Sequence, residues 1–390
     1  MPFWFYTTSW MKLPDTIAML RTLVAEPSTS SVSTSHDQSN LAVINHLANW
    51  LQGLKFVVDV LPISGKVGKA NLIATLGAGE GGLVLSGHTD TVPCDEECWG
   101  TDPYTLTEIG SVVHGLGSCD MKGFFPIALE AASLFHSQKL KKPLTILATS
   151  DEESSMAGAR QLLRDGRPKA DAAIIGEPTG LQPIIAHKGV LALSIIVEGA
   201  GGHASNPNLG SNALDAMHAV IEDLLIYRRE LADRHTNSNF EINIPTLNLG
   251  CLHAGDSPNR ICEKAELQID LRLLPGMENK ELVDTIQHRL IKTMATPGTR
   301  LSITQINEVP AYQTSSDGEL AKTLATLSRR TLGSVAFGTE APFLQSLGME
   351  TVIFGPGSID QAHHPYEYLD LNQLPSARET LEKVIRHYCY

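Results

Sequence analysis

The sequence predicts an α/β protein with a mostly parallel sheet, into which a second domain of the ferredoxin-like type is inserted. Short apolar runs alternate with amphipathic helical segments in the first half of the chain and again near its end, as is typical of a parallel sheet with helical connections. Between these parts the predicted order changes to β-α-β-β-α-β, the split unit of a ferredoxin-like domain. We therefore expect one domain in two parts, 1–183 and 309–390, and an inserted domain at 184–308.

The first part of the α/β domain follows a regular order. Ile17, Leu20 and Leu23 make a helical stripe, and a second amphipathic stretch ends at Gly53. The apolar run that begins at Leu83 is typical of a strand buried on both faces. The expected helices are 14–25, 39–54, 124–137 and 156–163, and the expected strands are 56–60, 71–75, 83–88, 144–149 and 172–175.

The inserted domain combines four strands with two long helices, and α/β character returns after it. In the insertion we expect strands at 190–198, 246–251, 265–273 and 301–306 and helices at 212–231 and 277–294. Beyond it we expect helices at 316–332 and 376–388 and a strand at 351–354.

Composition narrows the class of protein. The chain has 390 residues and a formal net charge of −13, which argues against nucleic-acid binding because that function leaves a basic footprint. Six cysteines in a chain of this length do not make a disulfide scaffold, and Cys94 and Cys98 lack the spacing of a zinc pair. No apolar segment approaches the roughly 18–20 residues of a spanning helix, and the opening lacks the pattern of a secretory signal. We therefore expect a soluble cytoplasmic protein whose natural start is Met11, since organised sequence begins near Leu13.

Side chains of metal-ligating types follow four of the apolar strands. These residues are His88 and Asp90, then Asp151, Glu152 and Glu153, then Glu177, and finally His363 and His364. Asp120 adds a further carboxylate from the glycine-bracketed turn GSCDMKG. Sites in open parallel sheets form outside the carboxyl ends of the strands, so we expect these groups to meet there.

The chemistry of this set favours a hydrolytic site with two metals. Histidine, aspartate and glutamate without cysteine suit zinc or cobalt, and the number of candidate ligands is too large for one catalytic zinc. It suits two metals about 3.5–4 Å apart that share a carboxylate. Because Glu152 and Glu153 are neighbours in an extended strand end, one can bind metal while the other serves as general base. Asp90 can supply a carboxylate to the second N–H of His88. An acidic helix N-terminus is the alternative interpretation of 151–153.

Several motifs resemble the di-zinc aminoacylase and exopeptidase family. They include SGHTDTVP, GLGSCDMKGF, LATSDEESSMAGAR, IIGEPTGLQP, GGHASNPNLGSNA and DLRLLPG. The resemblance runs from about Leu13 to the C-terminus and implies a di-metal hydrolase domain with an inserted dimerisation and lid domain. AHKG, PTLNLG, GTEAPF and GPGSIDQAHHPYEYL resemble one branch of the family, deacetylases of a small N-acetylated amino acid whose side chain carries an ammonium group.

Position by position, the resemblance implies the ligands of two divalent metal ions, Zn²⁺ or Co²⁺. His88 and Glu177 would bind one ion, Glu153 and His363 would bind the other, and Asp120 would bridge them. A hydroxide held between the metals would attack the amide. Of the two adjacent histidines, His363 occupies the position of the family ligand.

The remaining roles are implied in the same way. Asp90 would orient His88, and Glu152 would act as general base. His203, in the inserted domain, would reach the active site of the partner subunit in a homodimer and hydrogen-bond the developing oxyanion. The implied substrate-binding residues are Lys188, Asn259 and Arg272 for the α-carboxylate, and Glu340 for the ammonium.

Other functions are weighed against this one. A related deacylase, such as succinyl-diaminopimelate desuccinylase or a general N-acyl-amino-acid aminoacylase, would share the metal residues. A desuccinylase is expected to carry a different glycine-rich segment in place of GTEAPF. A non-catalytic, metal-binding dimeric scaffold would lack a ligand or the general base, and every such position is filled. A serine hydrolase is disfavoured because no G-x-S-x-G elbow occurs.

Overall fold

The computed structural model describes residues 13–136, 139–294 and 297–390, so the expected start at Met11 lies outside the described residues. The chain divides into two compact units. The first runs through Ile185 and includes Thr314–Leu332 and Phe343–Tyr390, and the second comprises Ala186–Gln313 and Gly333–Pro342. The sequence analysis placed the boundaries of the inserted domain after residues 183 and 308. It did not predict that Gly333–Pro342 also belongs to the second unit.

The first unit contains the strands β1-β2-β6-β3-β7-β15 of a sheet whose order continues to β8 and β13, with β14 also paired to β8. By residue range, β13 and β14 belong to the second unit. β6, β3, β7 and β15 run parallel, whereas the pairs β1–β2, β2–β6 and β15–β8 are antiparallel. The predicted fold class is confirmed, and the sheet is parallel at its centre only. The strands are β1 Val57–Pro62, β2 Ala70–Leu76, β3 Leu83–His88, β6 Leu144–Thr149, β7 Ala172–Ile175, β8 Ile184–His187, β13 Tyr312–Gln313, β14 Gly333–Val335 and β15 Glu350–Ile353.

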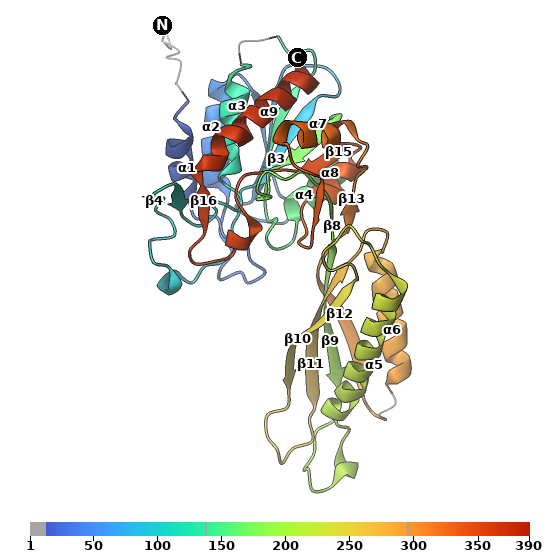
Figure 1. Cartoon of the computed structure of the whole chain (residues 1–390). Helices are drawn as coiled ribbons and strands as arrows, with labels where there is room; N and C mark the ends of the chain where they lie inside the picture. The colour runs from blue at the N-terminus through green and yellow to red at the C-terminus, as the bar shows by residue number, and fades with distance from the viewer. Residues whose placement is uncertain (1–12, 137–138, 295–296) are drawn as a thin grey trace, which may run out of the picture. The chain divides into compact units, whose positions relative to one another are not determined.

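Helices pack on this sheet through apolar side chains that are fully buried. Asp15 caps the first helix, since its carboxylate accepts the N–H of Ala18 at 2.8 Å. Helices α3 and α9 lie side by side in Figure 1 and share this core. The helices are α1 Thr16–Val24, α2 Leu41–Gly53, α3 Phe124–Ser133, α4 Ala157–Asp165, α7 Glu319–Ser328, α8 Ala341–Ser346 and α9 Leu374–Cys389.

The α3 helix ends at Ser133, earlier than the predicted limit of residue 137. The Ser133 hydroxyl donates to the Glu130 carbonyl at 2.7 Å, and the His136 ring contacts the Ser133 carbonyl. These side chains take carbonyls that a longer helix would use, which is how serine and its neighbours compete with helical bonding.

A small antiparallel sheet, absent from the sequence prediction, connects distant parts of the first unit. Its order is β16-β5-β4, with β4 at Thr107–Ile109, β5 at Val112–His114 and β16 at Tyr368–Asp370. Val113 and Leu369 face each other across it and are buried with Leu106, Leu20 and Val24. This pairing holds the segment that follows His363 next to the segment that precedes Asp120.

The second unit has the β-α-β-β-α-β order that the sequence predicts. Its antiparallel sheet has the order β10-β11-β9-β12, and α5 and α6 lie next to each other in Figure 1 and pack in one core with it. The elements are β9 Gly189–Glu198, α5 Ala213–Arg234, β10 Thr246–Ala254, β11 Lys264–Leu273, α6 Asn279–Thr293 and β12 Arg300–Val309. Within the described residues of both units, no helix combines the length and apolar character needed to cross a membrane.

His187 makes the stability of the second unit dependent on pH. Its ring is fully buried and stacks on Tyr312 at 5.3 Å, Nδ1 donates to the Lys188 carbonyl at 2.9 Å, and Nε2 has no partner among the described residues. Burial lowers the pKa of His187 to about 4. Below an unfolded-state pKa of about 6.5 the unfolded chain binds a proton that the folded unit does not, so stability falls as the pH drops from about 6.5 to about 4.

We expect this loss to reach about 3 kcal/mol, because each unit of pKa difference corresponds to about 1.4 kcal/mol. Urea unfolding of the wild type and of His187→Phe at pH 7 and pH 4.5 measures it. The variant should lose less stability on acidification than the wild type does. Equal losses in the two proteins would contradict the assignment.

Candidate active site

The carboxyl ends of the parallel strands bring the predicted metal-ligating residues to one edge of the sheet. β3 ends with His88, Glu153 follows β6, and Glu177 follows β7. His363 comes after β15 and the short turn η3, Ile359–Gln361, while Asp120 lies between β5 and α3. The structure therefore brings these predicted side chains together.

The first group consists of His88, Asp120 and Glu177, all buried. His88 Nε2 lies 3.0 Å from Asp120 Oδ1 and 3.9 Å from Glu177 Oε1. One ligand atom from each residue lies within 4.8 Å of the others, which is the arrangement expected around a single cation.

The second group consists of Asp120, Glu153 and His363. His363 Nε2 lies 3.1 and 3.2 Å from the two Glu153 carboxylate oxygens and 3.6 Å from Asp120 Oδ2. Since Oδ1 of Asp120 faces His88 and Oδ2 faces His363, this one carboxylate belongs to both groups. His364 belongs to neither group, and both it and His363 line an adjoining cavity of about 230 Å³.

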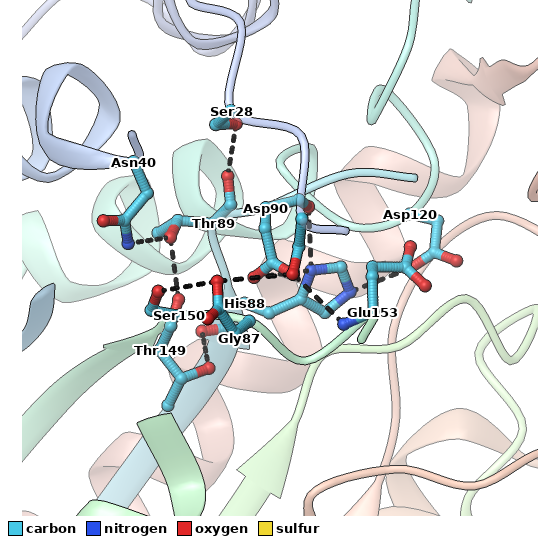
Figure 2. Close-up of polar contacts among 12 residues, drawn as sticks. Ser28, Asn40, Gly87, His88, Thr89, Asp90, Asp120, Thr149, Ser150 and Glu153 are labelled. Carbon is cyan, nitrogen blue, oxygen red and sulfur yellow. Dashed lines mark hydrogen bonds and ion pairs between the residues drawn. The ribbon is translucent and has the colours of Figure 1, made fainter. Parts of the chain in front are cut away.

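Asp90 supports the site in a way that differs from the sequence prediction. His88 Nδ1 lies 3.0 Å from the Asp90 main-chain carbonyl and 3.9 Å from its carboxylate, so the carbonyl is the hydrogen-bond acceptor (Figure 2). The carboxylate instead accepts the N–H of Glu153 at 3.0 Å. Asp90 therefore fixes one ligand through its backbone and a second through its side chain.

Hydrogen bonds around Thr89 hold the end of β3 in place (Figure 2). The Thr89 hydroxyl donates to the Thr149 carbonyl and accepts from Asn40 Nδ2, both at 2.7 Å. The Ser28 hydroxyl donates to the Thr89 carbonyl at 2.7 Å. All of these groups are buried, so the bonds between them are not exposed to competition from water.

The electrostatics of both groups call for additional positive charge. Desolvation alone would lower the pKa of His88, but the hydrogen bond to Asp120 and the charges of Glu177 and Asp90 hold that pKa well above its usual range. The hydrogen bond to Glu153 raises the pKa of His363 to about 9. The converging carboxylates thus favour protonation of both imidazoles. Divalent cations would replace those protons, and the nitrogen and oxygen donors suit zinc or cobalt, so the residues present fit a two-metal centre.

The two acidic residues that precede Glu153 behave differently. Glu152 is buried, at 9% exposure, and lies outside both ligand groups. Asp151 is directed to two lysines, with carboxylate oxygens 2.8 Å from Lys69 Nζ and 2.9 Å from Lys66 Nζ. Burial opposes its ionisation, but these ion pairs lower the pKa of Asp151. Asp151 therefore forms ion pairs beside the site. Of these two acids, Glu152 remains the candidate general base.

Sequence reasoning missed two buried ionisable side chains behind the Asp120 turn. The Lys122 ammonium donates to the carbonyls of Leu23 at 3.0 Å and Glu26 at 2.8 Å, and burial lowers the pKa of Lys122 to about 8. Glu367 is 1% exposed, and burial raises its pKa to about 8. The only sequence signal for Glu367 is an acidic residue close after the predicted ligand His363.

Of the five other predicted site residues, all in the second unit, four lie in two places. His203 and Asn259 belong to exposed loops, where the Asn259 carbonyl accepts the N–H of Ala204 at 3.0 Å. The Ser205 hydroxyl lies 2.8 Å from His203 Nδ1, so this contact uses Nδ1 and not Nε2.

Lys188 and Arg272 form the second place. Lys188 is buried and its ammonium donates to the Ile244 carbonyl at 2.7 Å. Desolvation and the charge of Arg272 lower the pKa of Lys188. Arg272 is held by Asp270, with Nε 2.8 Å from a carboxylate oxygen. Glu340 is also buried, at 1% exposure.

Comparisons with known proteins match this architecture over almost the whole chain. Residues 84–387 match the model of peptidase family M20/M25/M40. Acetylornithine deacetylase of Pectobacterium carotovorum subsp. carotovorum (strain PC1) is 44% identical over 381 residues, which cover 97% of this chain and 99% of that protein.

Solved structures share the fold at low sequence identity. An M20 family metallo-carboxypeptidase from Sulfolobus solfataricus is similar with a TM-score of 0.78 and 18% identity, covering 96% of this chain and 99% of that one. A dinuclear metal-binding peptidase of the M20 family from Bacillus subtilis has a TM-score of 0.67 and 16% identity, covering 96% and 97%.

Proposed function

The chain belongs to peptidase family M20/M25/M40, and within that family we propose that it removes the acetyl group from N²-acetyl-L-ornithine, giving L-ornithine and acetate. The family relationship predicted from the motifs is confirmed. The observation that carries the proposal is the shared carboxylate of Asp120 between two ligand groups, beside a buried acid at Glu152. A sequence identity of 44% to a named acetylornithine deacetylase, in an alignment that covers 97% of this chain, supports the substrate and a role in arginine biosynthesis.

We propose two divalent ions, Zn²⁺ or Co²⁺, as cofactors. His88 and Glu177 would hold one, Glu153 and His363 the other, and Asp120 both, in keeping with the dinuclear relative from Bacillus subtilis. When bound, the ions would supply Lewis acidity that polarises the acetyl carbonyl and lowers the pKa of a water molecule.

The chain's own residues then carry the proton and stabilise the developing charge. The Glu152 carboxylate takes a proton from the attacking water and passes it to the α-amine as the amide C–N bond breaks. His203 of the partner subunit would donate a hydrogen bond to the oxyanion. Acetate and the free amine leave, and Glu152 returns to its ionised form.

Residues of the second unit would recognise the amino-acid part of the substrate. Arg272, Lys188 and Asn259 are proposed to receive the α-carboxylate, which arginine can bind through two parallel hydrogen bonds. Glu340, a buried acid, is proposed to pair with the side-chain ammonium.

A comparison of two substrates tests these roles. Glu340→Gln should raise KM for acetylornithine by about tenfold or more, the effect of losing a hydrogen bond to a charged group, and leave KM for acetylmethionine nearly unchanged. Arg272→Met is the matched control and should raise KM for both, because both substrates carry the carboxylate. Equal effects of Glu340→Gln on the two substrates would remove the ammonium role.

A homodimer in the cytoplasm is the proposed working form. All six cysteines are free, as suits a reducing compartment. The exposed loop of His203 is available to a second copy of the chain. Sedimentation of the purified protein measures its oligomeric state, and fractionation of cells measures its location. A monomer or an exported protein would contradict the proposal.

Amine release from acetylornithine after chelation, and again after zinc or cobalt is restored, tests the function. Metal-dependent turnover of acetylornithine, without turnover of N-succinyl-diaminopimelate, is the expected result. Turnover of only the succinyl compound would identify a desuccinylase. Two bound metals with no turnover of either compound would favour a scaffold protein.

A further inference from the structure

We propose that Glu367 is a positioning residue, which fixes the bridging carboxylate of Asp120 by holding the backbone of the turn that carries it. The inference rests on the proposed two-metal centre and adds a residue that neither the ligand set nor the general base includes. It follows from hydrogen bonds between residues that are far apart in the sequence and adjacent in the first unit.

The Glu367 carboxylate is surrounded by main-chain donors of the Asp120 turn. Oε1 accepts the N–H groups of Cys119 at 2.8 Å and Asp120 at 3.0 Å, and Oε2 accepts the N–H of Gly117 at 2.9 Å. The carboxylate is buried, so these bonds are shielded from water. Both oxygens are therefore used to hold one short segment of backbone.

The small sheet places Glu367 opposite this turn. Glu367 immediately precedes β16, and the turn immediately follows β5. Tyr368 pairs with His114, and the N–H of Gly115 donates to the Glu367 carbonyl at 3.3 Å. The carboxylate thus reaches from the residue before β16 to the main-chain N–H groups of the turn.

The chemistry of the contact requires a carboxylate. Both oxygens of Glu367 accept main-chain N–H groups, and these three hydrogen bonds oppose the effect of burial on its pKa. A glutamine would keep one accepting oxygen but direct an amide donor toward one of the three N–H groups. Burying an acid costs free energy, and leaving the buried N–H groups of the turn without an acceptor would also cost free energy. The hydrogen bonds between the acid and the turn offset both costs.

The position of Asp120 is sensitive to this contact because its two oxygens serve different groups. Oδ1 lies 3.0 Å from His88 Nε2, and Oδ2 lies 3.6 Å from His363 Nε2. A rotation of the turn moves both oxygens together and weakens both groups. Outer contacts of this kind typically change metal affinity about 10- to 100-fold.

Zinc affinity, measured by competition with a chromophoric chelator, tests the proposal with two variants of the full chain. Glu367→Gln should raise the zinc dissociation constant about 10- to 100-fold. Val113→Ala, in the core of the same small sheet and away from the Glu367 carboxylate, is the matched control. It should lower stability and leave the dissociation constant within about twofold. Equal zinc binding by Glu367→Gln and the wild type, or equal weakening in the two variants, would overturn the proposal.

Amide hydrogen exchange in the metal-free protein provides a second test, and its wild-type measurement does not depend on folding of a variant. The N–H groups of Gly117, Cys119 and Asp120 should exchange slowly, and in Glu367→Gln they should exchange at least about tenfold faster. Rapid exchange of these groups in the wild type would overturn the proposal. A wild type that binds zinc but hydrolyses no acylated amino acid would contradict only the proposed function.

Discussion

Replacing Glu152 by glutamine is expected to lower kcat for acetylornithine by about 10²- to 10⁴-fold while both metals stay bound. A positioned general base contributes an effect of this size, and glutamine cannot accept the proton. Metal content should not change, because Glu152 lies outside both ligand groups. Steady-state kinetics and elemental analysis of the same sample measure the two quantities.

The exposed residue Glu80 provides the control for this variant. Glu80→Gln makes the same chemical change on the surface of the first unit and should leave kcat within about twofold of the wild type. Loss of metal from Glu152→Gln, or a kcat within tenfold of the wild type, would argue against a role as general base.

Subunit mixing extends the same experiment to His203. If His203 acts in the partner's site, Glu152→Gln and His203→Ala homodimers are both impaired, yet a mixed dimer has one intact site. Statistical exchange of subunits should then restore about a quarter of wild-type activity. No recovery, with exchange of subunits demonstrated by mass spectrometry, would place His203 outside the partner's site.

Replacing Asp120 by asparagine is expected to impair both metals at once and to lower kcat by about 10³-fold or more. Asparagine keeps the size of the side chain but offers one oxygen, whereas the structure uses Oδ1 toward His88 and Oδ2 toward His363. Loss of metal removes several kcal/mol of transition-state stabilisation, and each 1.4 kcal/mol is about tenfold in rate.

Glu177→Gln is the matched comparison, because Glu177 belongs to one ligand group only. Titration with zinc should show one weakened site in Glu177→Gln and two in Asp120→Asn. Two unaltered zinc sites in Asp120→Asn would exclude the bridging role.

Sequence reasoning succeeded where a local pattern decides the structure. β3 and β6 begin and end as predicted because strands buried on both faces are continuous apolar runs bounded by polar residues. The same strand ends identify His88 and Glu153. The family and the fold class follow from motifs at these ends, and the comparisons confirm both.

Other features depend on contacts that no local pattern encodes. The strands of the small sheet are three residues long, and β5 pairs with β16 across most of the first unit's sequence. The role of Glu367 exists only through that pairing. Strand alternation placed Asp90 on the side of His88, but the turn after β3 brings its carbonyl closer than its carboxylate. Asp151 has a positive φ of 61°, so it departs from the extended backbone that the argument assumed.

The order of the ligands along the chain has a consequence for how the protein is made. His88, Asp120 and Glu177 all precede the insertion, whereas His363 follows Glu153 by 210 residues. At about 5–20 residues per second, a ribosome needs roughly 10–40 s to cover that distance. For most of this interval the growing chain already contains all three residues of the first proposed metal group, while the second still lacks its histidine. If the centre binds metals as proposed, its two halves are completed at different times during the synthesis of each molecule.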